Sequence, residues 1–81
     1  MACINPDGTL TEVARRVLGA LADPATPEEL TGRTGLPLHR IRATLRETGR
    51  AKLIELIEPD GSTWRLTGLG REVLDLDEDE R

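Results

Sequence analysis

Apolar and polar residues alternate along the first part of the chain with the period of an α-helix. Between residues 10 and 21 the apolar positions follow i, i+3, i+4, i+7 spacing, which predicts a helix with one buried face. Thr9 and Glu12 have the spacing of a capping box, in which each side chain accepts from the other residue's backbone N–H. Pro24 cannot continue a helical hydrogen-bond ladder, so the helix is expected to end before it.

A helix-turn-helix pattern follows directly. Thr26 and Glu29 form a second capping box, which predicts a short helix over residues 27–34. A tight turn that begins at Gly35 then leads into a third helix, predicted over residues 37–48. Two helices joined by so short a turn are typical of helix-turn-helix motifs.

The period changes to that of β-strands after the third predicted helix, which is expected to end at Gly49. Two strand-like runs, residues 52–58 and 63–66, flank a Pro-Asp-Gly turn. Short β-prone runs around such a turn predict a β-hairpin. The predicted fold class is therefore α+β and mostly helical.

The chain is predicted to end in a helix and an acidic tail. Residues 67–74 can be helical with Thr67 as the cap, and the apolar edge of this helix is formed by Leu69, Val73 and Leu76. Residues 75–81 hold five acidic residues against one arginine and are interpreted as an acidic C-terminal tail. Residues 1–8 end in a turn-forming sequence and are interpreted as a flexible N-terminus, which leaves residues 9–74 as one domain.

Positive charge is concentrated in the third predicted helix. The whole chain carries a net charge of −4, yet residues 37–52 hold five cations against Glu47 alone. At about 100° per residue, six side chains lie opposite the core stripe of this helix or on its flanks: His39, Arg40, Arg42, Ala43, Arg46 and Arg50. Such asymmetry indicates a nucleic-acid-binding face, although a solvated helix whose arginines pair with Glu47 gives the same count.

Composition excludes several classes of protein. One cysteine and one histidine cannot complete a metal site or a nucleophilic catalytic arrangement, so we predict no enzyme activity, no metal and no cofactor. No apolar run approaches the roughly 18 residues of a membrane span, and residues 1–7 lack the features of a signal peptide. A cytoplasmic protein without a membrane partner is therefore expected. At 81 residues the core is small, which favours a homodimer.

The order of these elements resembles a winged helix-turn-helix domain, and several motifs carry the resemblance. The sequence Thr-Pro-Glu-Glu-Leu at residues 26–30 and the sequence Thr-Gly-Leu at residues 34–36 are similar to the start of the second helix and to the turn of that family. The sequence Trp-Arg-Leu-Thr at residues 64–67, followed by Gly70 and Arg71, is similar to the signature after the wing in MarR-like and related bacterial and archaeal regulators. The resemblance implies a three-helix core, a two- or three-stranded β wing and a C-terminal helix.

The resemblance also implies a transcriptional regulator that binds double-stranded DNA. In that family the third helix enters the major groove and the wing lies along the DNA backbone or in the minor groove. The positions that the resemblance places against DNA are His39, Arg40, Arg42, Ala43, Thr44, Arg46 and Arg50 on the third helix and Gly61, Ser62 and Arg65 on the wing. Arginine can bind guanine bidentately or neutralise a phosphate, which suits this role.

Acidic segments keep a second interpretation open. Glu58 and Asp60 lie near the wing tip, where DNA-binding wings of the family commonly carry cations, and phosphates would repel them. The acidic tail also opposes the overall attraction to DNA, although a flexible tail can be held away from the DNA or lie across the basic helix as a competitor. The alternative function is a protein-interaction module that uses the acidic wing or the tail as its contact surface.

Overall fold

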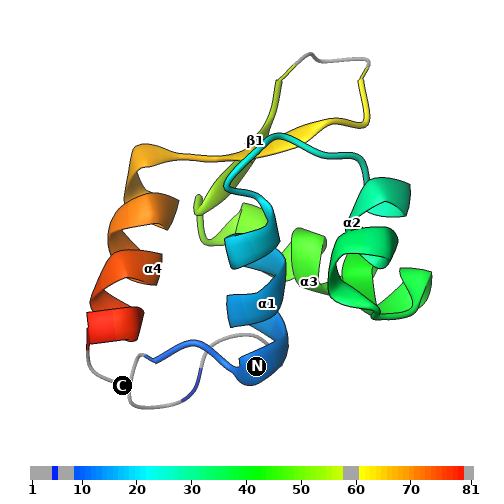
Figure 1. The fold of residues 1–81 in the computed structure, drawn as a ribbon. Helices are drawn as coiled ribbons and strands as arrows, with labels where there is room; N and C mark the ends of the chain where they lie inside the picture. Colours follow the sequence, from blue (N-terminus) through cyan, green and yellow to red (C-terminus); the bar gives the residue numbers. More distant parts are fainter. Residues whose placement is uncertain (1–4, 6–8, 58–60, 80–81) are drawn as a thin grey trace.

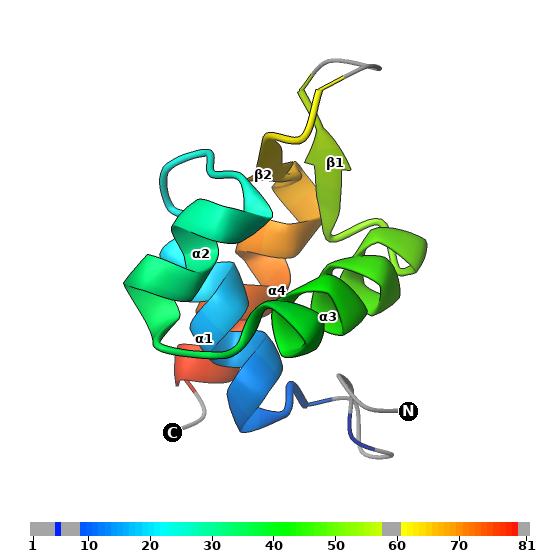
Figure 2. The same ribbon diagram turned by 90° about the vertical axis from the view of Figure 1, so that its right-hand side faces the viewer.

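The computed structural model describes Asn5 and residues 9–57 and 61–79, and it confirms the predicted mostly helical α+β fold (Figure 1). The elements follow one another in the order α1 (Glu12–Ala20), α2 (Pro27–Thr34), α3 (Leu38–Arg50), β1 (Ile54–Leu56), β2 (Trp64–Leu66) and α4 (Gly68–Asp79). Figure 1 shows α1 between α3 and α4, and Figure 2, in which α3 lies in front, shows α4 behind α1. No helix within the described ranges is long and apolar enough to cross a membrane.

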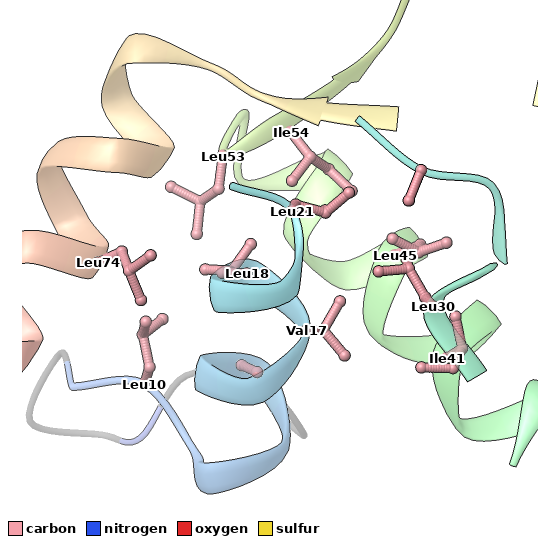
Figure 3. Packing of buried hydrophobic residues seen from close by; sticks show 12 residues of the cluster. Leu10, Val17, Leu18, Leu21, Leu30, Ile41, Leu45, Leu53, Ile54 and Leu74 are labelled. Atoms are coloured by element: carbon pink, nitrogen blue, oxygen red, sulfur yellow. The ribbon is translucent and has the colours of Figure 1, made fainter. Parts of the chain in front are cut away.

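The core is aliphatic, because the chain contains no Phe or Tyr and only one Trp. Buried side chains from every helix and from the start of the hairpin meet around α1 (Figure 3): Leu10, Val17, Leu18, Leu21, Leu30, Ile41, Leu45, Leu53, Ile54 and Leu74. Each such side chain contributes about 1.5–3 kcal/mol relative to an exposed one. This shared core holds α2 and α3 at a defined angle to the rest of the molecule.

Helix α1 begins later than its capping pattern predicts. Thr11, not Thr9, is the N-cap, and the Thr11 hydroxyl accepts from the Ala14 backbone N–H at 3.2 Å. The predicted capping box of Thr9 with Glu12 is therefore wrong. The reason is tertiary, because the backbone N–H of Leu10 donates to Asp77 Oδ1 of α4 at 3.2 Å and Leu10 stays outside the helix.

Helix α2 has the bounds and caps that its sequence predicts. The Thr26 hydroxyl accepts from the Glu29 N–H at 3.1 Å, and the Glu29 carboxylate accepts from the Thr26 N–H at 2.9 Å. Gly35 follows the helix in the left-handed region, with φ of 75°. A residue without Cβ adopts this conformation at little cost, so Gly35 sets the tight turn into α3.

The hairpin is shorter than predicted, with three-residue strands in place of residues 52–58 and 63–66. The strands pair antiparallel, with Glu55 opposite Arg65. On its other side β2 forms an isolated bridge with Ala25. The Trp64 N–H donates to the Ala25 carbonyl at 2.8 Å, and the Ala25 N–H donates to the Trp64 carbonyl at 3.0 Å. Strand β2 therefore lies between β1 and the segment before α2. Of the predicted turn at residues 59–62, Pro59 and Asp60 lie outside the described residues.

Helix α4 is longer than predicted, and residues 75–79 belong to it. The prediction that a tail begins at residue 75 is therefore wrong. Asp77 is buried, and its carboxylate accepts from the Leu10 N–H and from Arg15 Nε, the latter at 2.7 Å. These contacts tie α4 to α1 and raise the pKa of Arg15 further above its usual range, chiefly through the hydrogen bond to Asp77.

The start of α4 agrees with the prediction that Thr67 is its cap. The Thr67 hydroxyl accepts from the Gly70 N–H at 2.9 Å and donates to the Lys52 carbonyl at 2.7 Å. One side chain thus caps α4 and joins it to the residues after α3. Residues 1–4 and 6–8, where we predict a flexible N-terminus and a turn, lie outside the described residues.

Candidate nucleic-acid interface

Helix α3 presents one buried and one exposed side. Its buried side chains are Ile41, Thr44, Leu45 and Thr48, which recur at helical spacing and pack toward the core. The helix runs to Arg50, so the prediction that it ends at Gly49 is wrong. A Cβ at Gly49 would lie 3.7 Å from the Trp64 ring, which places this glycine in packing against the hairpin.

Thr44 belongs to the core, which corrects its expected place against DNA. Only 2% of the residue is exposed, and its hydroxyl donates to the Arg40 carbonyl at 2.9 Å. Thr48 is buried in the same way, with its hydroxyl 2.8 Å from the Thr44 carbonyl. Both hydroxyls are satisfied by their own helix, so threonine is tolerated at these core positions without a polar partner from another element.

The exposed side of α3 carries the cations that the sequence analysis singled out. The exposed members are His39, Arg40, Arg42, Arg46 and Arg50, with Ala43 partly buried among them. Arg40, Arg46 and Arg50 form no ion pair with any described residue. The pairing with Glu47 that would make this face an ordinary solvated surface is therefore not present. We call the six residues from His39 to Arg50 on this side the basic face.

Arg42 is the member of the basic face that has an acidic neighbour. Its Nη2 lies 3.8 Å from Oε2 of Glu28, and the side chains are 61% and 65% exposed. Glu28 belongs to the first turn of α2, so the start of α2 lies beside the basic face. Sequence reasoning missed this neighbour, although an acidic residue in the first turn of the helix before a tight helix-turn-helix was a visible signal.

The wing adds little positive charge in its described part. Arg65 is the only cation within residues 54–57 and 61–66, and its Nε lies 2.8 Å from Oε2 of Glu55 on the neighbouring strand. Ser62 is exposed and Gly61 is partly buried. The structure thus places Gly61, Ser62 and Arg65 on the hairpin, and the charge of Arg65 is already opposed by Glu55. Glu58 and Asp60 lie outside the described residues.

The end of α4 lies on the other side of α1 from α3 (Figures 1 and 2). Asp77 is buried against α1, and Asp75 precedes it on the same helix. The hypothesis that these residues lie across the basic helix as a competitor is therefore wrong for residues 75–79. Among the described residues, no group of three or more His, Cys, Asp and Glu side chains is arranged to hold a metal ion.

Comparison with known proteins identifies the fold from its three-dimensional arrangement. No family model and no curated protein matches the sequence. A solved structure of BpsR from Bordetella bronchiseptica superposes with a TM-score of 0.82 at 22% sequence identity, over 91% of this chain. The fold is a winged helix-turn-helix.

The match to BpsR covers only part of the BpsR chain. This chain spans 56% of the BpsR chain, so the remainder of BpsR has no counterpart in it. The BpsR structure concerns the mechanism by which 6-hydroxynicotinic acid regulates the DNA binding of that protein. In this winged helix, α2 and α3 form the helix-turn-helix, and β1 with β2 forms the wing.

Proposed function

We propose that this protein is a transcriptional regulator that binds double-stranded DNA and inserts α3 into the major groove. The observation that carries the proposal is the row of exposed arginines on α3, three of which have no ion-pair partner among the described residues. A major groove about 12 Å wide accepts an α-helix of about 10–12 Å diameter. The similarity to BpsR, whose DNA binding is regulated, supports the same function for this fold.

The residues of the basic face divide by what they can contact. Arg40, Arg46 and Arg50 are exposed cations that can neutralise phosphates or bind guanine bidentately. His39 can donate to a base or a phosphate, and Ala43 can contact a thymine methyl group. Thr44 is left out of the contact set because its side chain is buried.

The wing contributes through its shape and its hydroxyl group more than through charge. The ion pair of Arg65 with Glu55 leaves Ser62 as an exposed hydrogen-bond donor toward a phosphate. Gly61 beside it adds no side chain that would hold the backbone away from DNA. Most of the affinity therefore comes from α3.

A salt titration tests the proposal. If Arg40, Arg46 and Arg50, the three arginines of α3 without an ion-pair partner among the described residues, each neutralise one phosphate, log affinity should fall against log salt with a slope near −2.7, from about 0.9 per phosphate. Arg46→Ala should reduce the magnitude of the slope by about 0.9, whereas Arg16→Ala, an exposed arginine of α1, should leave it unchanged. Absence of binding to any duplex at low salt, in a sample folded by circular dichroism, would contradict the proposal.

A protein-interaction module is the second candidate function, and the wing favours it. Leu56 and Ile57 of the hairpin are 37% and 40% exposed, and they lie next to Glu55. Contiguous apolar surface rimmed by polar residues marks protein-interaction sites, and these two side chains are adjacent in the chain. The salt titration separates the two functions, because only the DNA-binding protein should show duplex affinity that falls with salt.

We also infer that two copies associate through α4. Leu69 and Leu76 are 49% and 57% exposed and lie seven residues apart, on one side of the helix. Val73, predicted on the same edge, instead packs against the core. A second copy that covers the two leucines would remove both from water.

A further inference from the structure

Arg42 differs from the other arginines of the basic face because a carboxylate lies beside it. Its Nη2 is 3.8 Å from Oε2 of Glu28, and no other arginine of α3 has a carboxylate within 4.0 Å among the described residues. We propose that Glu28 makes Arg42 a base-reading residue by penalising phosphate at that position. The inference rests on the proposed DNA-binding function and assigns specificity within the same interface.

The fold sets the position of Glu28 relative to α3. The capping box of Thr26 and Glu29 fixes the start of α2, and Glu28 lies between them in the first turn. Gly35 then turns the chain into α3 with a single left-handed residue. The pair of Glu28 with Arg42 is thus produced by the angle between two packed helices, whose side chains Leu30 and Ile41 are both fully buried.

The exposure of both side chains lets Arg42 change its partner. At 61% and 65% exposure, water screens the attraction, and pairs of this kind contribute little to folding. Glu28 also interacts favourably with the positive end of the α2 dipole, which is its ordinary structural role. That role affects the stability of α2 but not the preference for one DNA sequence over another, so the two roles can be separated by experiment.

The charge of Glu28 acts differently on the two kinds of DNA group that an arginine can bind. A phosphate at Arg42 would place two negative groups about 4 Å apart, which in water weakens binding by about five-fold. The O6 and N7 atoms of guanine are neutral acceptors and do not meet this repulsion. Because specificity is a difference between affinities, a carboxylate that disfavours phosphate raises the discrimination in favour of a base contact.

The substitution Glu28→Gln tests the inference with the full chain. We would measure affinity for a duplex obtained by unbiased selection and for a scrambled duplex of the same length, each at several salt concentrations. Affinity for the scrambled duplex should rise about five-fold, and its salt slope should become steeper by about 0.9, as one more phosphate is neutralised. The ratio of the two affinities should fall by a similar factor.

Glu72→Gln is the matched control, because Glu72 is an exposed acid of α4 and the substitution changes the net charge equally. Its effect on the slope should be near zero, since α4 lies on the other side of α1 from the basic face (Figure 2). Equal effects of the two substitutions would overturn the inference and leave the proposed function intact. Absence of duplex binding by the unsubstituted protein would instead overturn the proposed function.

A second pair of variants tests Arg42 itself. Arg42→Gln should lower the ratio of affinities for the preferred and the other base pairs, at one position of the site, by roughly ten-fold or more. It should change the slope of log affinity against log salt only slightly. Arg46→Gln removes a side chain that forms no ion pair with any described residue, and it should change the slope by about 0.9 with little change in discrimination between bases. The inference would be overturned if Arg42→Gln reduced the salt slope as much as Arg46→Gln does and left the discrimination between base pairs unchanged.

Discussion

At the scale of single residues, Gly70 has no room for a side chain. A Cβ at this position would lie 1.9 Å from the Leu53 carbonyl oxygen and 2.8 Å from its carbon. The neighbouring atoms are backbone, which cannot rotate away as a side chain can. The glycine of the post-wing signature is therefore explained by the approach of α4 to the residues after α3.

Gly70→Ala should destabilise the protein by about 3 kcal/mol, at the upper end of what overpacking costs. Gly68→Ala is the control, since a Cβ at Gly68 meets nothing within 4 Å. That control should be neutral or stabilising by about 0.4–1 kcal/mol, because alanine restricts the unfolded chain. Urea denaturation of the two variants measures the difference, and equal midpoints would contradict the packing seen at Gly70.

At the scale of elements, the capping box of α2 is the best-defined local motif. The Thr26 backbone N–H donates to the Glu29 carboxylate, and this bond is the main cause that lowers the Glu29 pKa below its usual value. Partial desolvation opposes the shift, while the Thr26 hydroxyl and the charge of Arg33 add to it. The stability of the start of α2, where Glu28 also lies, therefore depends on pH.

The lowered pKa of Glu29 predicts a loss of stability in acid. Because the folded-state pKa lies below the unfolded value, the charged carboxylate stabilises α2 above the unfolded pKa of about 4.3, and its contribution is lost as pH falls through the folded pKa. Glu29→Gln keeps a side chain that can accept from Thr26 but removes the charge. In urea denaturation, the original protein should be more stable than this variant at pH 7, and the gap should close toward pH 3. A gap that widens in acid would contradict the assignment.

At the scale of the whole molecule, α1 separates two surfaces of different character. Helix α3, which carries the basic face, lies on one side of α1, and α4 lies on the other (Figure 1). The ion pair of Arg15 with Asp77 holds α4 against α1 and leaves Leu69 and Leu76 exposed. DNA and a second copy of the chain can therefore bind without competing for one surface.

The proposed dimer predicts a concentration-dependent mass. The original protein should sediment as a dimer, whereas Leu69→Gln with Leu76→Gln should sediment as a folded monomer, since exposed positions change stability by only about 0.5 kcal/mol. Leu56→Gln on the wing is the control and should remain dimeric. A monomer mass for the original protein at high concentration would remove the dimer from the proposal.

The predictions from sequence succeed where a structure is formed by residues close together in the chain. The bounds of α2 and its capping box match, and so do the cap at Thr67 and the exposure of Arg46 on α3. The positive charge of α3 could also be predicted from the sequence, because it depends only on residue type and helical period. For the exposed residues of α3 and of the wing, contact with DNA remains a prediction.

The chain by itself determined the order of the elements, the turn at Gly35 and the charge of α3, since each follows from local hydrogen bonds, backbone conformation or side-chain type. Only the tertiary structure decided which groups meet across long separations in the chain. Asp77 became a buried partner of Leu10 in place of a tail residue, and Glu28 came to lie beside Arg42. The physical reason is that burial and ion pairing depend on the packing of distant segments, which no periodicity within one segment records.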